Sequence, residues 1–315
     1  MIAARYSQTG GSDVLEVGEV PTPQPGPGEV LVRLAVAGVN PTDWKFRAGA
    51  TGSLNFDFQV PGQDGAGVIE AVGEGVAKAW KGERVWVYLA AWQSQWGTAA
   101  EYTVVPVEKA VPLGDASFEL GASLGVPALT AYHCLFSDGP IEGQRVLVHG
   151  GAGAVGHAAI ELARWGGASE VVTTVSSPEK AELAGAADVI VNYRQDGAAE
   201  KIGKVDRIVE VALGPNLALD LEVANPYATI MTYAADQPSA EVPIRAAMSA
   251  NLSLRFMLLY TIPEPALHDA IGGVSKAVEA GALTLLPLHR FPLAETGAAH
   301  DAVENGAVGK VVIDT

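Results

Sequence analysis

Glycines at a fixed spacing are the first residues of this chain whose types could support chemistry. Gly151, Gly153 and Gly156 fit the pattern G-x-G-x-x-G, between an apolar run and a segment of helical periodicity. Such a turn lets the backbone approach a pyrophosphate, and the following helix N-terminus supplies free N–H groups. The strand–turn–helix context favours this interpretation over a turn that binds nothing. The predicted dinucleotide loop comprises Gly150, Gly151, Ala152, Gly153, Ala154, Val155 and Gly156.

A second signal lies about 20 residues after this loop, where an acidic residue usually holds the ribose 2′-hydroxyl of NAD. Ser176 stands at this position. A hydroxyl removes the repulsion against a 2′-phosphate, and Ser177 and Lys180 offer further donors. Each has a structural alternative, because Ser177 could simply cap a helix and Lys180 could be a solvated charge. The run therefore favours NADPH over NADH.

Short apolar strands alternating with helices must position this loop. Such alternation indicates a doubly wound parallel sheet covered on both faces, as in a Rossmann domain. One more apolar segment, residues 252–260, is expected to be a late edge strand of this sheet. The other strands are predicted at residues 145–149, 170–175, 188–191, 206–211 and 227–233, and the helices at 154–165 and 178–185.

The two ends of the chain have a different, β-rich pattern. After a helix that ends near Glu279, the tail is too short for a core of its own and is expected to rejoin the N-terminal part. The predicted α/β fold therefore has two domains, a β-rich one at 1–117 and 263–315 and a nucleotide-binding one at 118–262. The β-rich domain is expected to have strands at 29–39, 67–72, 84–88, 101–105, 282–286 and 310–314.

Composition excludes several classes of protein. The 315 residues are 49% hydrophobic and 18% charged, which supports a sizeable core and excludes a mostly disordered chain. The net charge of −16 argues against binding to nucleic acid or to an anionic membrane surface. No apolar run is long enough for a membrane helix. Cys134 is the single cysteine, so an intrachain disulfide is excluded and a cytoplasmic location is expected.

Several motifs together resemble one known family. They run in order along essentially the whole chain, and as a set they are similar to the zeta-crystallin-like quinone oxidoreductases of the medium-chain dehydrogenase/reductase superfamily. The resemblance implies a GroES-like catalytic domain and a Rossmann domain, NADPH as the cofactor, and reduction of quinones or activated carbonyls. Besides the glycine loop, the motifs are residues 38–43 (GVNPTD), 47–49 (RAG), 61–67 (PGQDGAG), 99–102 (AAEY), 129–132 (LTAY), 191–194 (VNYR) and 309–312 (GKVV).

The resemblance also suggests the catalytic residues. Asn40 and Thr130 are expected near the nicotinamide, and Asp43 near the active-site cleft. Asn40 could donate a hydrogen bond to a substrate carbonyl or to the nicotinamide ribose. The alternatives are that Asn40 caps the turn before Pro41 and that Asp43 caps the start of a helix.

Further cofactor contacts follow from the same resemblance. Tyr193 is expected against the adenosine phosphate, with a half-buried packing residue as the alternative. Backbone groups of Phe256, Met257 and Leu258 are expected to touch the carboxamide, which is compatible with a core strand.

No metal site is expected. The zinc-dependent alcohol dehydrogenases of this superfamily have a Cys near the position of Asn40, a His-Glu pair at Gln63 and Asp64, and a Cys near Val126. One carboxylate cannot replace the three protein ligands of a catalytic zinc. The resemblance therefore points to the zinc-free branch.

The sequence-based conclusion is an NADPH-dependent reductase of a small apolar or aromatic carbonyl compound. An enoyl reductase of the same superfamily and a non-catalytic NADPH-binding protein are the alternatives. Pairing of the apolar edge at 252–260 predicts a homodimer, with a tetramer possible. Aromatic residues on which a flat substrate could stack are Trp44, Phe56, Phe58, Trp92 and Trp96.

Overall fold

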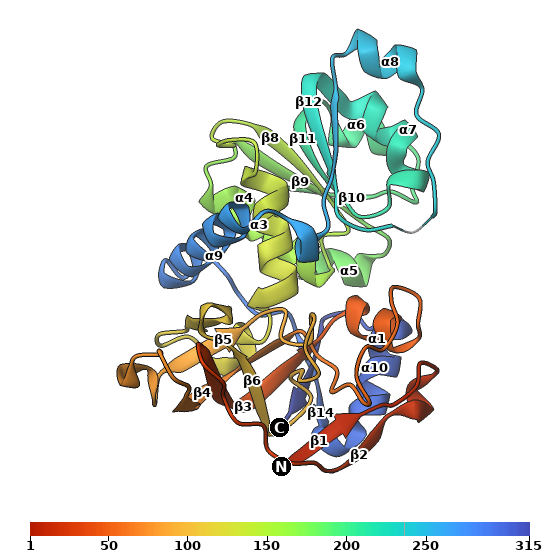
Figure 1. Ribbon diagram of the computed structural model, residues 1–315. Helices are drawn as coiled ribbons and strands as arrows, with labels where there is room; N and C mark the ends of the chain where they lie inside the picture. The colour runs from red at the N-terminus through yellow and green to blue at the C-terminus, as the bar shows by residue number, and fades with distance from the viewer. Residues whose placement is uncertain (236) are drawn as a thin grey trace. The chain divides into compact units, whose positions relative to one another are not determined.

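The computed structural model describes residues 1–235 and 237–315. Its contacts divide the chain into two compact units (Figure 1). The first unit comprises Met1–Val126 and Pro287–Thr315, and the second comprises Pro127–Leu286. The C-terminal tail therefore rejoins the N-terminal part of the chain, as predicted.

The first unit is built on a mostly antiparallel sheet in the order β14-β15-β3-β4-β5-β7, with β6 also paired to β3. The long strand β3 (Glu29–Val39) lies between β4 (Asp64–Val72) and β15 (Lys310–Asp314), antiparallel to both. One end of the sheet therefore gathers the end of β3 and the starts of β4 and β15. The other elements are β1 (Ile2–Arg5), β2 (Glu16–Glu19), α1 (Pro41–Arg47), β5 (Arg84–Val87), β6 (Tyr102–Pro106), β7 (Ala110–Pro112), α2 (Phe118–Gly121), a π-helical turn (Leu124–Ala128), β14 (Leu288–Pro292) and α10 (Thr296–Glu304).

The second unit contains a parallel sheet in the order β10-β9-β8-β11-β12-β13. Helices pack on this sheet in Figure 1, and side chains of α7 such as Leu213 and Leu217 bury Leu147 and Ile208 of the strands. This is the predicted doubly wound sheet. Its elements are α3 (Leu129–Phe136), β8 (Arg145–His149), α4 (Ala154–Trp165), β9 (Glu170–Val175), α5 (Pro178–Leu183), β10 (Val189–Asn192), α6 (Ala198–Ile202), β11 (Val205–Glu210), α7 (Leu213–Val223), β12 (Ala224–Thr232), α8 (Ile244–Ser249), β13 (Ser253–Phe256) and α9 (Glu264–Glu279).

Both divisions between the units fall later than the predicted boundaries at 117 and 262. Helix α2 packs on β3, β4 and β5 of the first unit, which keeps the chain there until Val126. Helix α9 packs on α3 of the second unit, where a Cβ atom at Gly273 would lie 1.9 Å from the ring of Tyr132. This close helix packing holds residues 263–286 in the nucleotide-binding unit rather than in the β-rich one.

Two strand predictions need correction. The expected strand at 252–260 is reduced to β13, followed by a 3₁₀ turn at Leu259–Thr261, although β13 does lie at the sheet edge as predicted. Residues 282–286 form no strand in the described chain. The backbone N–H of Thr284 donates instead to the Glu161 carboxylate at 2.9 Å, so the segment is fixed by a side chain and not by a ladder.

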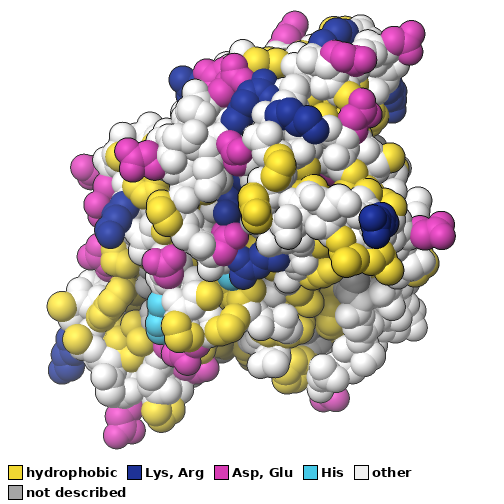
Figure 2. Space-filling view, turned by 90° about the horizontal axis from the view of Figure 1, so that it is seen from above, with side chains coloured by type: hydrophobic (Ala, Val, Ile, Leu, Met, Phe, Trp, Pro, Cys, Tyr) yellow, Lys and Arg dark blue, Asp and Glu magenta, His cyan; other side chains and the backbone are white. Residues whose placement is uncertain are grey.

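Charged groups are distributed over the surface. Figure 2 shows acidic and basic side chains interspersed with exposed hydrophobic ones on the face seen from above. Within the part of the chain that the structure describes, no helix is both long enough and apolar enough to cross a membrane.

Candidate active site and nucleotide loop

The glycine loop has the geometry of a backbone-lined ligand cradle. A Cβ atom at Gly151 would lie 2.1 Å from Thr173 Oγ1, and one at Gly156 would lie 2.2 Å from the Gly150 carbonyl oxygen. Both positions therefore need glycine for packing. At Gly153, by contrast, such a Cβ atom would make only an ordinary contact, 3.4 Å from the Gly150 carbonyl oxygen, and Gly153 itself is exposed. This is the arrangement that lets a phosphate group approach backbone N–H groups.

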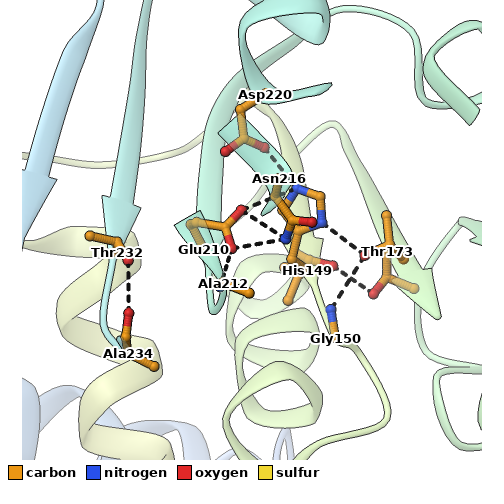
Figure 3. A network of polar contacts seen from close by, with 11 residues as sticks. His149, Gly150, Thr173, Glu210, Ala212, Asn216, Asp220, Thr232 and Ala234 are labelled. Carbon is orange, nitrogen blue, oxygen red and sulfur yellow. Dashed lines mark hydrogen bonds and ion pairs between the residues drawn. The ribbon is translucent and has the colours of Figure 1, made fainter. Parts of the chain in front are cut away.

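A buried polar network supports the loop from below (Figure 3). His149, the last residue of β8, has Nδ1 2.9 Å from Thr174 Oγ1 and Nε2 2.8 Å from Asp220 Oδ1. Glu210 Oε2 lies 3.5 Å from the same Nε2 atom. The Gly150 N–H donates to Thr174 Oγ1 at 3.4 Å, which links the network to the first glycine of the loop.

Three titratable groups of this network influence one another. Burial raises the pKa of Glu210, while the nearby His149 opposes the shift. Burial alone would lower the pKa of His149, but its hydrogen bond to Asp220 and the two carboxylates outweigh burial and raise it. His149, Glu210 and Asp220 each have one side-chain atom that could bind a metal ion, and these three atoms lie within 4.8 Å of one another. His149 Nε2 is in hydrogen-bond range of Asp220, and Glu210 accepts from the Ala212 N–H and from Asn216, so a hydrogen-bonded network accounts for the cluster.

The predicted 2′-phosphate residues lie at neighbouring strand ends. Ser176 follows β9, and the Tyr193 N–H, just after β10, donates to the carbonyl of Val175 at 3.2 Å. Ser177 Oγ accepts the Lys180 N–H at 3.4 Å, so Ser177 does cap α5. Arg194, for which the sequence predicted no role, has its guanidinium 6.0 Å from the centre of the Tyr193 ring. Its place directly after Tyr193 in the VNYR motif was the available signal.

The other predicted cofactor contacts also fall in the second unit. Thr130 is buried on α3. Phe256 ends β13 with 71% of its surface exposed, Leu258 is exposed, and the Met257 N–H donates to the carbonyl of Thr232 at 3.0 Å. Thr130 thus belongs to the second unit, whereas Asn40 belongs to the first.

In the first unit, Asn40 and Asp43 lie at the start of α1. The Asn40 backbone N–H donates to Asp43 Oδ2 at 2.7 Å, so Asp43 does cap the helix. The Asn40 amide points elsewhere, because Nδ2 donates to Asp64 Oδ2 at 2.7 Å and Oδ1 accepts from Lys310 Nζ at 2.8 Å. Asp43 Oδ1 is buried and has no hydrogen-bond partner among the described residues.

Asp64 is the centre of this cluster. Its Oδ1 accepts the backbone N–H of Val126 at 2.8 Å, from the π-helical turn. A Cβ atom at Gly125 would lie 2.0 Å from the same oxygen, so this glycine leaves room for the carboxylate. Lys310 lies in the GKVV motif at residues 309–312, which was the available signal, but the motif alone predicted no role for this side chain. Only the pairing of β15 with β3 brings it to Asn40.

Burial dominates the electrostatics of the cluster. It raises the pKa of Asp43 from 3.8 to about 7, although the bond from the Asn40 N–H opposes the shift. It raises the pKa of Asp64 to about 6, and the Lys310 ammonium limits that rise. Burial also lowers the pKa of Lys310, while Asp64 and Asp43 oppose the change. Near neutral pH, Asp43 is therefore poised between its acid and its carboxylate form.

A cavity of about 200 Å³ opens beside Asp43. Of the five aromatic residues predicted for substrate stacking, Phe56 and Trp92 line it. Phe58 instead packs edge-on against Trp96, with ring centres 5.6 Å apart. The residues around the cavity are Tyr6, Asp43, Phe46, Asn55, Phe56, Gln59, Pro61, Gly62, Gln63, Ala91, Trp92 and Gln93.

Comparisons with known proteins agree with this architecture. Residues 26–115 match the alcohol dehydrogenase GroES-like domain, and residues 184–313 match the zinc-binding dehydrogenase family. The quinone oxidoreductase of Lama guanicoe is 31% identical over 99% of this chain and 97% of its own length. The chain belongs to the quinone oxidoreductase family.

Solved structures of this superfamily have the same fold over the whole chain. A mycobacterial protein complexed with NADPH is 30% identical, with a TM-score of 0.86 and complete coverage of both chains. A thermostable alcohol dehydrogenase from Pyrobaculum aerophilum is also 30% identical, with a TM-score of 0.85 and coverage of 100% of this chain and 99% of that one. The resemblance inferred from the sequence motifs is thereby confirmed.

Catalytic zinc, which the name of one matching family implies, does not fit the residues present. Positions 40, 63 and 126 of this quinone oxidoreductase family member carry Asn, Gln and Val. Both oxygens of Asp64 already accept hydrogen bonds, from Val126 and Asn40. A buried ammonium, that of Lys310, lies on the other side of Asn40 and would repel a metal ion.

The buried acids predict an unusual pH dependence of stability. Asp43, Asp64 and Glu210 have pKa values raised above those of the unfolded chain, so the folded state binds more protons between about pH 4 and pH 7. The free energy of unfolding should therefore fall as pH rises through this window, and His149 adds to the same trend. His300 and His133, whose pKa values burial lowers, oppose the trend but are outnumbered by the acids. Below this window, stability should fall again as Glu119, with its lowered pKa, becomes protonated.

Urea unfolding between pH 4 and pH 8 measures this dependence. Glu210→Gln should reduce the change in the free energy of unfolding over this pH range by about 1–3 kcal/mol, because one buried titrating group is lost. Glu182→Gln, at an exposed position, is the matched control. A Glu210→Gln profile as steep as that of the unmodified protein would contradict the prediction.

Proposed function

We propose that this protein is an NADPH-dependent oxidoreductase that transfers a hydride to a quinone or another activated carbonyl compound. One observation carries the proposal: Asp43, a buried acid with a pKa of about 7, lies in the wall of an aromatic cavity. Reduction of a carbonyl needs a proton as well as a hydride, and Asp43 can supply it near neutral pH. The names of the relatives support the same reaction class.

The second unit would hold the cofactor. The exposed backbone at Gly153 suits the pyrophosphate, and Ser176, Tyr193 and Arg194 suit the 2′-phosphate end. NADPH supplies the hydride, that is, both electrons of the reduction. The first unit would hold the substrate, with Phe56 and Trp92 offering flat apolar surfaces.

Asp43 would complete the reaction. When the hydride adds to the substrate, negative charge develops on the carbonyl oxygen, and the protonated Asp43 carboxyl donates its proton to that oxygen. Asp43 is left as a carboxylate and regains a proton from solvent. A quinone is easily reduced, so positioning and one proton donor suffice.

A carbon–carbon double bond conjugated to a carbonyl could use the same hydride and the same proton donor, so an enoyl reductase is the second candidate. A protein that only binds NADPH is the third, and turnover tests separate it from both.

The single cysteine supports a reducing compartment such as the cytoplasm.

Substrate class and metal independence can be tested together. After exhaustive chelation, NADPH oxidation with 1,4-benzoquinone should keep its full rate, and ethanol oxidation should be negligible, because no zinc stabilises an alkoxide here. α,β-Unsaturated ketones in the same assay distinguish the quinone reductase from the enoyl reductase. Binding of NADPH without turnover of any substrate in this panel would overturn the proposal. Activity lost on chelation and restored by zinc would contradict metal independence.

Cofactor choice is the next expectation. NADPH should bind more tightly than NADH by about 1.5–3 kcal/mol, because at least one charge-assisted hydrogen bond reaches the 2′-phosphate. Ser176→Asp should erase or reverse this preference by placing a carboxylate near that phosphate. Titration of cofactor fluorescence measures both affinities, with Ser239→Asp, an exposed position in the same unit, as the control. Equal affinities in the unmodified protein would refute the assignment.

We also propose a homodimer formed through the edge strand β13. Five large apolar side chains around this end of the sheet are 53–76% exposed, which is unusual for a surface left in water. Two-fold pairing of the edge would cover them and protect the strand. These residues are Tyr227, Ile244, Met248, Phe256 and Leu258.

Light scattering at micromolar concentration should give the mass of two chains, or of four if dimers pair. Met248→Glu should shift the population toward monomers, because a charge would be buried at the interface. Val17→Glu, at an exposed apolar position of the first unit, should leave the mass unchanged. A monomeric unmodified protein would show that this apolar edge has another role.

A further inference from the structure

Lys310 is a lysine in an unusual place. It is 2% exposed at the first position of β15. Its Nζ donates to Asn40 Oδ1 at 2.8 Å and to the Val39 carbonyl at 3.4 Å, across 270 residues of sequence in the first case. Lysine is almost never this buried unless its charge is paired, so the surroundings must stabilise the ammonium.

The fold leaves space for this amine. Gly38 lies opposite Val312 in the ladder of β3 and β15, and a Cβ atom there would lie 3.1 Å from Lys310 Nζ and 2.0 Å from the Ala122 carbonyl oxygen. Any side chain at position 38 would therefore press on the ammonium and on the chain beside it. The close approach of these segments is what brings Lys310 to Asn40.

The hydrogen bonds around Asn40 admit one amide orientation. An ammonium only donates hydrogen bonds, and an ionised carboxylate only accepts them. Asn40 Oδ1 must therefore face Lys310, and Nδ2 must face Asp64. The reversed amide would place two donors together on one side and two acceptors together on the other, so Lys310 and Asp64 fix the orientation jointly.

We propose that Lys310 is a positioning residue and the internal counter-cation of this site, holding the Asn40 amide in one orientation and balancing the buried carboxylates beside it. For catalysis, this inference rests on the proposed reductase function. A protein-borne cation then occupies the cluster in which metal-dependent relatives would hold an ion. Two charged groups act on Asp43, namely Asp64 of β4 and Lys310 of β15, and Asp43 in turn acts on Tyr6, after β1. Arg47 of α1 also acts on Tyr6, and it interacts with Glu304 and His300 of α10.

The first test needs no substrate. Carbon-13 NMR of protein labelled at the aspartate carboxyl carbons reports the titration of Asp43 and Asp64, assigned from Asp43→Asn and Asp64→Asn spectra. In Lys310→Met, the Asp64 midpoint should rise by about 1–3 pH units, the size expected when a nearby opposite charge is removed. The Asp43 midpoint should rise by less. Lys204→Met, which removes a lysine bonded to the Glu222 and Ala224 carbonyls, should shift neither midpoint.

The second test separates positioning from folding. Lys310→Met leaves buried carboxylates without a cation and could unfold the unit, whereas Lys310→Met/Asp64→Asn removes both charges. In this double variant, Asn40 can turn over and accept from the new amide, so the unit should fold. The double variant should nevertheless lose roughly 10- to 100-fold in kcat for quinone, a factor typical of a displaced group near the reacting atoms. The pH dependence of kcat should shift as well, because Asp64 and Lys310 are the charged groups that act on Asp43.

The outcomes are distinct. Unchanged Asp43 and Asp64 midpoints in a folded Lys310→Met protein would overturn the counter-cation role. If Lys310→Met does not fold, the test rests on the double variant. A double variant with the turnover and pH profile of the unmodified protein would show that Lys310 has only a structural role. If the unmodified protein reduces no quinone or enone, the proposed function fails. The carboxyl titrations, or the amide resonances of Asn40 in the double variant, still decide this inference.

Discussion

The cost of removing charge from water is the constraint that organises both units. Two carboxylates and one ammonium are buried at the end of the first sheet, and each is tolerated only because another group of the set lies nearby. Asp64 accepts hydrogen bonds from the Val126 N–H of the π-helical turn and from the Asn40 amide. The carbonyl oxygen of that amide accepts a hydrogen bond from Lys310. Asp43 has less compensation, and its raised pKa is the direct result. Asp43, the proposed proton donor, is thus the carboxyl group that has the fewest hydrogen-bond partners in this network.

The second unit meets the same constraint differently. Beneath the glycine loop, two carboxylates share one imidazole, and no lysine or arginine side chain takes part in the described contacts of His149. The charge is balanced by protons held on Glu210 and His149, whose pKa values are both raised. The polar network reaches Gly150, so the loop proposed to meet the phosphates is linked to Glu210, whose pKa burial raises to about 7.

Local signals allowed much of this to be predicted from the sequence. The loop glycines, the parallel strands and the capping role of Asp43 depend on residues within a few positions of one another. The GKVV motif contains Lys310 but could not reveal its role, because that role depends on the pairing of strands that are far apart in the sequence. The same holds for Asp64, whose partner Val126 acts through a backbone N–H and leaves no mark on residue type. The strand expected at 282–286 failed because Glu161, more than 100 residues away, captures the Thr284 N–H.

The joint orientation of Asn40, Asp64 and Lys310 also bears on how such a site can evolve. Replacing Asn40 by a cysteine would leave the Lys310 ammonium and one oxygen of Asp64 without their present partner. Replacing Lys310 alone would leave the carboxylates without a cation, and histidine or cysteine at a neighbouring position could not bind metal while that cation remained. Each single substitution toward a metal-binding set would therefore give a less stable protein. At this cluster, the Lys310 ammonium and a metal ion would therefore exclude one another.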